Sequence, residues 1–228
     1  MIAHTVEQRS DAWFRLRVGK ITASQAAKML AVTKTGWSVQ RQDLKMQIAC
    51  EMLTGCSCQP HISANSAMQR GVDLEGLAIG AYECHQNTLV ERGVGFFEVE
   101  GIAAGCSPDG VAVVQVGGRA VKGLIEVKCP TTKIHLEYLR SGIVPAMYEP
   151  QLLHSLWVAG PEFEFIDFFS FDDRLPEGLR TFWVREWRDE ARIQRHADAV
   201  SVFLDEVQTE IAALLALRWE KKYGIGLD

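Results

Sequence analysis

Asp109, Glu126 and Lys128 are the residues whose types and spacing best suit chemistry in this chain. Asp109 lies in a Pro-Asp-Gly turn after a short apolar run. Glu126 and Lys128 lie two residues apart in a strand pattern, which predicts that their side chains point to the same face of a sheet. If the two segments are neighbours, both carboxylates meet at one end of that sheet. Converging carboxylates repel, and Mg²⁺ relieves the repulsion because it takes carboxylate oxygens and keeps several waters. The lysine would hold or activate a water, or contact a phosphate oxygen.

A hairpin with a solvated charged face is the simpler interpretation of a lone match to this spacing. In this chain, however, apolar strand residues flank the acids, which favours a site on core elements. The flanking apolar positions are Ile102, Val111, Val113, Val114, Val116, Leu124, Ile125 and Val127.

The length of 228 residues and the 47% hydrophobic content allow a full core, and we expect one domain over 1–228. No apolar run is long enough to span a bilayer, and the first residues lack the pattern of a signal peptide. We therefore expect a cytoplasmic protein with no membrane partner. Six scattered cysteines favour reduced thiols, and Cys56, Cys58 and His61 lack the further ligands of a zinc site.

The net charge of −5 is unevenly distributed. Residues 1–60 hold eight Lys or Arg against four Asp or Glu, a net +4, which leaves −9 for the rest of the chain. This basic first third is compatible with phosphate contacts in a local groove rather than over a broad surface.

The periodicities predict a helical part over about 1–86, a mixed sheet over about 87–188 and a last helix over 189–223. We expect shorter helices over 11–19, 22–32, 38–53, 63–85, 131–140 and 145–157. We expect strands over 88–91, 95–99, 102–106, 111–116, 124–129, 163–171 and 181–187, the first five forming a meander.

Thr22 and Ser24 are typical helix N-caps, and this role alone accounts for them. A capped helix start is also an anion site, to which Arg17 would add a bidentate guanidinium. Two further polar residues lie on predicted helices. Glu75 borders an apolar stripe, where a solvated carboxylate is ordinary. Gln151 shares a face with Tyr148 and either satisfies core backbone groups or orients a water or phosphate.

Five ordered motifs between about residues 11 and 160 resemble the lambda exonuclease family of phage-type recombinases, in the PD-(D/E)XK nuclease superfamily. The motifs are Trp13-x3-Arg17-x4-Thr22-Ala23-Ser24, Gly71-x3-Glu75, Cys106-Ser107-Pro108-Asp109-Gly110, Glu126-Val127-Lys128-Cys129-Pro130 and Tyr148-x2-Gln151-x5-Trp157. The resemblance implies an α/β fold with a restriction-endonuclease-like core, in which helices flank a central mixed β-sheet.

The resemblance also implies a function. Members of the family are metal-dependent enzymes that degrade one strand of linear duplex DNA processively from its 5′ end, releasing mononucleotides and leaving a 3′ single strand. They form homotrimeric rings and work beside a single-strand annealing protein in recombination. The implied cofactor is Mg²⁺, as two ions, with Mn²⁺ as an alternative.

Residue roles follow from the same resemblance. Metal ligation is implied for Asp109, Glu126 and the carbonyl of Val127. Positioning and deprotonation of the attacking water are implied for Lys128, Glu75 and Gln151, although Pro150 would start or kink the helix and move Gln151.

A pocket for the terminal 5′ phosphate is implied for Arg17, Ser24 and Ser107, with Thr22 as a weaker member. Met68 matches a position at which the family places an apolar wedge against the duplex end, and is otherwise a core methionine. Two alternatives share the fold: an endonuclease or repair nuclease, and a non-catalytic DNA-binding recombination subunit. The complete Asp109, Glu126 and Lys128 set argues against the second.

Overall fold

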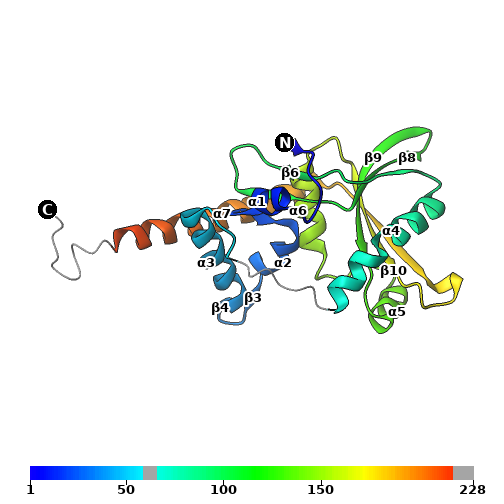
Figure 1. Cartoon of the computed structure of the whole chain (residues 1–228), viewed down its shortest axis with the longest axis horizontal. Coiled ribbons are helices and arrows are strands. Elements are labelled where there is room, and N and C mark those ends of the chain that lie inside the picture. The colour runs from blue at the N-terminus through cyan, green and yellow to red at the C-terminus, as the bar shows by residue number, and fades with distance from the viewer. Residues whose placement is uncertain (59–65, 218–228) are drawn as a thin grey trace.

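The computed structural model describes residues 1–58 and 66–217 (Figure 1). Its helices are α1 (Asp11–Arg17), α2 (Ala26–Met29), α3 (Val39–Thr54), α4 (Ser66–Gln86), α5 (Thr132–Ser141), α6 (Glu149–Ala159) and α7 (Glu190–Ala216). Its strands are β1 (Ile2–His4), β2 (Ile21–Thr22), β3 (Val32–Thr33), β4 (Gly36–Trp37), β5 (Val90–Glu91), β6 (Phe96–Glu98), β7 (Ala104–Cys106), β8 (Gly110–Val116), β9 (Arg119–Lys128), β10 (Phe165–Phe171) and β11 (Thr181–Trp187). No helix within these ranges is long and apolar enough to cross a membrane.

The central sheet has the strand order β11-β10-β9-β8-β5. Strands β9 and β10 are parallel and the other neighbours are antiparallel, so the sheet is mixed, as predicted. A second sheet has the order β1-β6-β7-β2. The predicted meander is therefore wrong, because β6 and β7 pair with each other and with β1 and β2 rather than with the central sheet. Alternation in the sequence predicts strands but not their partners.

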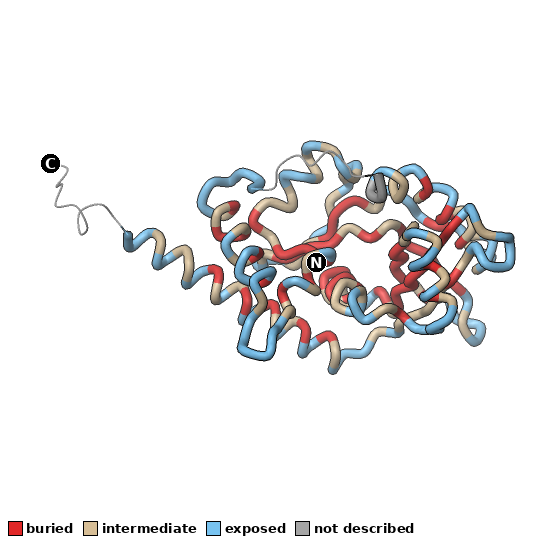
Figure 2. Tube along the Cα trace, turned by 90° about the horizontal axis from the view of Figure 1, so that it is seen from below, coloured by how far each residue is buried: buried red, intermediate tan, exposed pale blue. Residues whose placement is uncertain are grey.

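Helices cover both faces of the central sheet. Ala78 and Tyr82 of α4 pack on Ile125 and Val127 of β9, on one face. Residues of α5 and α6 pack with Leu124 on the other face. In Figure 1, α1, α2, α3 and α7 gather to one side of this sheet, and the far end of α7 extends beyond the body of the molecule. Figure 2 shows the buried residues concentrated along the central strands and the inner helix faces.

Local signals account for several helix ends. Ser10 and Ser38 accept hydrogen bonds from the backbone N–H groups of Trp13 and Arg41, both at 3.2 Å, and so begin α1 and α3. Gly55 ends α3 with φ of 67°, a conformation that favours glycine. Pro150 lies in the first turn of α6, where its missing N–H is tolerated.

Two predicted boundaries are wrong around these helices. The helix predicted over 22–32 begins with a 3₁₀ turn (Ala23–Gln25) and ends at Met29, after which a β3–β4 hairpin follows that the periodicity did not predict. The helix predicted from 145 begins at Glu149, because a turn closed by the Tyr148 N–H and the Pro145 carbonyl oxygen, 2.8 Å apart, precedes it.

Candidate active site

Asp109 is fixed beside β9 by two hydrogen bonds. Its backbone N–H donates to the carbonyl oxygen of Ile125 at 3.0 Å, and its Oδ2 accepts the N–H of Val127 at 2.7 Å. Gly110 follows and pairs with Ile125 across the ladder, where a Cβ would lie 2.4 Å from a methyl carbon of Val90. The Pro-Asp-Gly turn therefore carries the chain from the second sheet into the central one and delivers Asp109 next to Glu126.

Alternation along β9 places the other two residues as predicted. Ile125 and Val127 lie in the layer under α4, whereas Leu124 packs in the opposite layer. Glu126 is on the Leu124 side and is 5% exposed. The Lys128 ammonium donates to Glu126 Oε1. Both residues therefore point to one face, at the end of the sheet where Asp109 lies.

Gln151 reaches the same carboxylate from α6. Its Nε2 donates to Glu126 Oε1 at 2.6 Å. Pro150 starts the helix and does not displace Gln151 from this site. Glu126 Oε1 thus accepts hydrogen bonds from an ammonium and an amide, which orient the carboxylate.

The charges at this end of the sheet are unbalanced on the acidic side. Burial and the charge of Glu126 raise the pKa of Asp109 well above its usual value, and Glu75 adds to the rise; Lys128 and the Val127 N–H oppose it. Burial disfavours the charged form of Lys128, but the Glu126 and Asp109 carboxylates outweigh burial and raise its pKa. Lys128 therefore stays an ammonium, and a further cation would favour ionisation of Asp109.

Glu75 approaches the site from α4. Its charge contributes to the raised pKa of Asp109. Its Oε2 accepts a hydrogen bond from Nη2 of Arg9 at 2.8 Å. The structure thus pairs Glu75 with Arg9, which sequence reasoning missed. The pairing joins positions 66 residues apart, for which no local sequence signal exists.

The donor set fits a hard cation such as Mg²⁺. Within residues 1–58 and 66–217, no three His, Cys, Asp or Glu side chains form a preassembled metal cage. Mg²⁺ rarely uses such a cage, because it keeps waters and takes only one or two carboxylates. In the same ranges, Asp109 Oδ1 and Glu126 Oε2 accept no hydrogen bond, so each carboxylate has an oxygen left for an ion.

The predicted anion site gathers around Arg17. The guanidinium lies over the Trp13 ring, 4.1 Å from its centroid, and Nη2 donates to Thr22 Oγ1 at 3.3 Å. The hydroxyls of Thr22 and Ser24 are 3.5 Å apart. Trp13 Nε1 donates to Ser107 Oγ at 2.6 Å. All four residues of the predicted phosphate pocket are therefore linked, and Ser107 is two positions from Asp109.

A pocket of about 220 Å³ opens beside Arg17. It is lined by Trp13, Phe14, Arg17, Val18, Thr22, Gln25, Gln47, Glu51 and Ser57. Burial lowers the pKa of Arg17 to about 10, against the opposing charge of Glu51, so the guanidinium stays charged at neutral pH. Glu51 is engaged elsewhere, by the Gly19 N–H at 2.9 Å and Gln47 at 3.0 Å. Arg17 forms no ion pair with a described carboxylate, which leaves its charge available for an anion.

Met68, the predicted wedge, lies in the first turns of α4, but its side chain is outside the described residues. His61, weighed for zinc, also lies outside them. All six cysteines are free thiols. Two buried histidines lie elsewhere: His135 contacts Ser170 Oγ at 2.7 Å, and His154 pairs with His196 at 3.1 Å.

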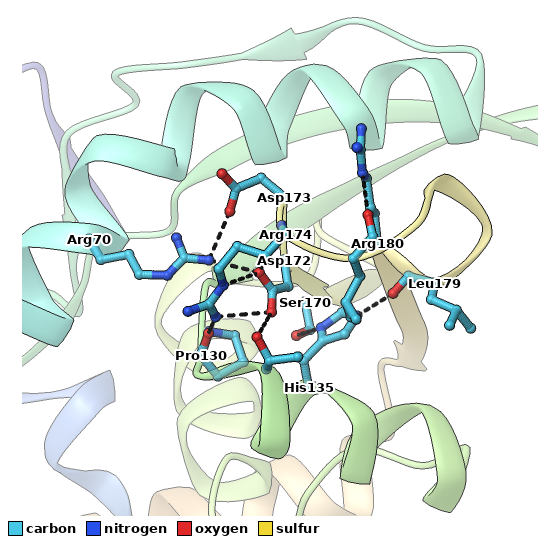
Figure 3. A network of polar contacts seen from close by, with 11 residues as sticks. Arg70, Pro130, His135, Ser170, Asp172, Asp173, Arg174, Leu179 and Arg180 are labelled. Atoms are coloured by element: carbon cyan, nitrogen blue, oxygen red, sulfur yellow. Dashed lines mark hydrogen bonds and ion pairs between the residues drawn. The ribbon is translucent and has the colours of Figure 1, made fainter.

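A second polar cluster, also missed, holds the helices at the end of β10 (Figure 3). Asp172 is fully buried and accepts hydrogen bonds from Arg70 of α4 and Thr132 of α5, at 2.9 and 2.6 Å, and from Arg174 at 2.8 Å. Arg174 also reaches the carbonyl oxygen of Pro130, just beyond β9, at 3.4 Å. These bonds hold the pKa of Asp172 below its usual value despite burial. The cluster fixes α4 against the ends of β10 and β9, and β9 carries Glu126.

A mixed sheet flanked by helices, with an aspartate, a glutamate and a lysine meeting at one strand end, is the PD-(D/E)XK fold, as predicted. The family model described as YqaJ-like viral recombinase domain matches residues 12–162. The chain belongs to this family, and its resemblance to the lambda exonuclease family is confirmed.

Solved structures of exonucleases are similar to this chain. LHK-Exo, an alkaline exonuclease from Laribacter hongkongensis, is 35% identical, with a TM-score of 0.78 over 91% of this chain and 97% of that chain. The same enzyme in complex with dAMP is 36% identical, with a TM-score of 0.77 over 90% and 96%. A phage related exonuclease from Haemophilus somnus 129PT is 18% identical, with a TM-score of 0.60 over 86% and 96%, and shares the fold. No curated protein sequence matches the chain.

Proposed function

We propose that residues 1–228 work as one Mg²⁺-dependent exonuclease domain. It degrades linear double-stranded DNA processively from 5′ to 3′, releases mononucleotides and leaves a 3′ single strand for recombination by strand annealing. The observation that carries this proposal is the meeting of Asp109, Glu126 and Lys128 at one strand end, with Gln151 on the same carboxylate. Membership of the YqaJ-like family supports a nuclease in recombination.

Each site residue has a role in hydrolysis of the phosphodiester bond. Asp109, Glu126 and the carbonyl of Val127 would hold two Mg²⁺ ions, or Mn²⁺ in their place, which when bound polarise the scissile phosphate and the attacking water. Lys128 stays protonated beside Glu126, and so it can hold the water or stabilise a phosphate oxygen. Gln151 orients Glu126 through its hydrogen bond, and Glu75 would help to take the proton of the water.

The pocket at Arg17 would hold the 5′-terminal phosphate. Arg17 offers a charged fork, and the hydroxyls of Ser24 and Ser107 are further contacts for the phosphate. Thr22 is the weaker member, because it is buried and its hydroxyl donates to Gln25 Oε1 at 2.9 Å and accepts from Arg17. Ser107 and Asp109 belong to one turn, so an end phosphate bound here would lie beside the hydrolytic residues. A pocket that requires a terminal phosphate distinguishes an end from an interior position. The complex of LHK-Exo with dAMP supports a mononucleotide as the product.

The test uses linear duplex DNA labelled separately at its 5′ and 3′ ends. We expect the 5′ label to be released first, as a mononucleotide, in Mg²⁺ and not in EDTA. Early release of the 3′ label would contradict the polarity. Cutting of closed circular duplex would favour the alternative of an endonuclease or repair nuclease, and binding of DNA without any release of nucleotides would favour the non-catalytic recombination subunit.

The phosphate pocket has its own test. Arg17→Ala should abolish the preference for 5′-phosphorylated over 5′-hydroxyl ends, and Arg17→Lys, which keeps the charge but not the fork, should restore only part of it. Retention of the full preference by Arg17→Ala would count against the pocket.

The active form that we propose is a homotrimeric ring around the DNA, acting in the cytoplasm beside a single-strand annealing protein. The ring is supported by the family resemblance and by exposed apolar side chains at the projecting end of α7, Leu215 and Leu217. Light scattering should give three times the mass of one chain, and a monomer under the conditions of activity would contradict it.

A further inference from the structure

Arg9 has a backbone conformation that its residue type disfavours. Its φ is 68°, in the left-handed region, where a Cβ is strained. The other non-glycine residue with positive φ in the described ranges is Asn87, a type that tolerates this region. Strained backbone persists only where the surrounding structure holds it, and it clusters at functional sites. Arg9 is therefore a candidate functional residue that none of the sequence motifs singled out.

The neighbours of Arg9 hold it between the two halves of the candidate active site. Gln8 Nε2 donates to the carbonyl oxygen of Pro108, the residue before Asp109, at 3.0 Å. Ser10 Oγ accepts the N–H of Trp13 at 3.2 Å, and Trp13 donates to Ser107. The turn around Arg9 is thus bound on one side to the turn that carries Asp109 and on the other to helix α1, which carries Trp13 and Arg17.

The Arg9 guanidinium pairs with Glu75. Nη2 donates to Glu75 Oε2 at 2.8 Å, and the two side chains are 47% and 26% exposed. An ion pair this exposed adds little to stability, so it does not explain why the strain is retained. Its described contacts engage a single nitrogen of the guanidinium, which has five N–H donors, so donors remain for an anion.

We propose that Arg9 binds a backbone phosphate of DNA at the mouth of the candidate metal site. The inference rests on the proposed function and adds a second arginine to it. Guanidinium groups match phosphate oxygens bidentately, and Glu75 holds this one in place. Because the terminal phosphate belongs to Arg17, the contact at Arg9 is to an interior phosphate. The contact at Arg9 therefore contributes equally to the binding of 5′-phosphorylated and 5′-hydroxyl duplexes, unlike the contact at Arg17.

The test variant is Arg9→Gly, which removes the guanidinium and also relieves the backbone strain, so the fold should melt no lower than the wild type. The measurement is equilibrium binding of linear duplex, with Ca²⁺ in place of Mg²⁺ to prevent hydrolysis. We expect affinity to fall about tenfold or more for both kinds of end, and the salt dependence of binding to decrease by about one ion. Arg92→Gly is the matched control, because Arg92 is an arginine of similar exposure paired with Glu83, also on α4. It should leave affinity unchanged.

A double-mutant cycle with Glu75→Gln separates a phosphate contact from mere support of Glu75. If Arg9 touches DNA, Arg9→Gly weakens binding in the Glu75→Gln background as well. No further loss in that background, or an equal loss in Arg92→Gly, would overturn the inference. The proposed function fails separately, if the wild type releases no nucleotides in Mg²⁺. A wild type that digests DNA while Arg9→Gly binds it equally well refutes the inference alone.

Discussion

Replacing Asp109 by asparagine should stabilise the metal-free protein while removing its response to Mg²⁺. Burial and the charges of Glu126 and Glu75 raise the pKa of Asp109 in the folded state. A group with a raised folded-state pKa contributes stability below its unfolded pKa and loses it as the pH rises through the folded pKa. The ionised Asp109 therefore destabilises the metal-free fold toward neutral and alkaline pH.

The magnitude follows from what the substitution changes. An asparagine oxygen can still accept the Val127 N–H, which lies 2.7 Å from Asp109 Oδ2, so the loss is confined to the charge. A single stabilising substitution commonly gains about 0.5–2 kcal/mol. For a chain of this length each kcal/mol raises the Tm by roughly 2–4 °C. Mg²⁺ at ten times its Kd should stabilise the wild type by about 1.4 kcal/mol and the variant hardly at all.

Thermal unfolding at about pH 8, in EDTA and in Mg²⁺, measures both effects, since the ionised form is then favoured. Asp205→Asn is the matched control: it makes the same chemical change on the exposed surface of α7, and it should respond to Mg²⁺ as the wild type does. A lower Tm of Asp109→Asn in EDTA, or a Mg²⁺-induced rise equal to that of the wild type, would refute the reasoning.

Three further predictions concern the surroundings of the site. Burial lowers the pKa of His154 to about 3 and that of His196 to about 4, so the stability that this neutral pair contributes is present above about pH 6.5 and is lost as the pH falls toward about 4. Urea unfolding should show this loss of stability, and the loss should be smaller in His196→Asn. Equal wild-type stability at about pH 7.5 and about pH 5 would contradict the prediction. Asp172→Asn leaves two guanidinium groups without their shared carboxylate and should cost on the order of 2 kcal/mol in urea unfolding, since one partner is half exposed; a cost near zero would show that the cluster does not hold the helices. Gln151→Ala should lower kcat by about 10- to 100-fold with little change in KM, because it removes a hydrogen bond that orients the Glu126 carboxylate rather than a contact with DNA. An unchanged kcat would show that Gln151 is not part of the site.

Local patterns were sufficient to predict the parts of the site that lie on one element. The two-residue period of β9 placed Glu126 and Lys128 on one face because strand alternation is a property of the backbone. The long helices α3 and α4 followed from periodicity and from caps such as Ser38 and Gly55. Gathering of Arg17 with Ser107 was predicted from the family resemblance, since the two are 90 positions apart.

What depends on tertiary partners could not be predicted. The assignment of β6 and β7 to a second sheet follows from their pairing with β1 and β2, and strand alternation carries no information on pairing. The contacts of Arg9 with Glu75 and of Arg70 with Asp172 join positions 66 and 102 residues apart. Charged residues at such separations resemble ordinary solvated positions until the fold brings them together.

Single-turnover digestion of 5′-phosphorylated linear duplex by the wild type and by Glu126→Gln, each in Mg²⁺, tests the central claim most directly. Glutamine keeps the shape of the side chain at the point where Lys128 and Gln151 meet, but it removes the charge that would hold the ion. We predict release of nucleotides by the wild type and a rate more than about a hundredfold lower in the variant, whose fold should remain intact by circular dichroism. Digestion by a folded Glu126→Gln at the wild-type rate would contradict the account.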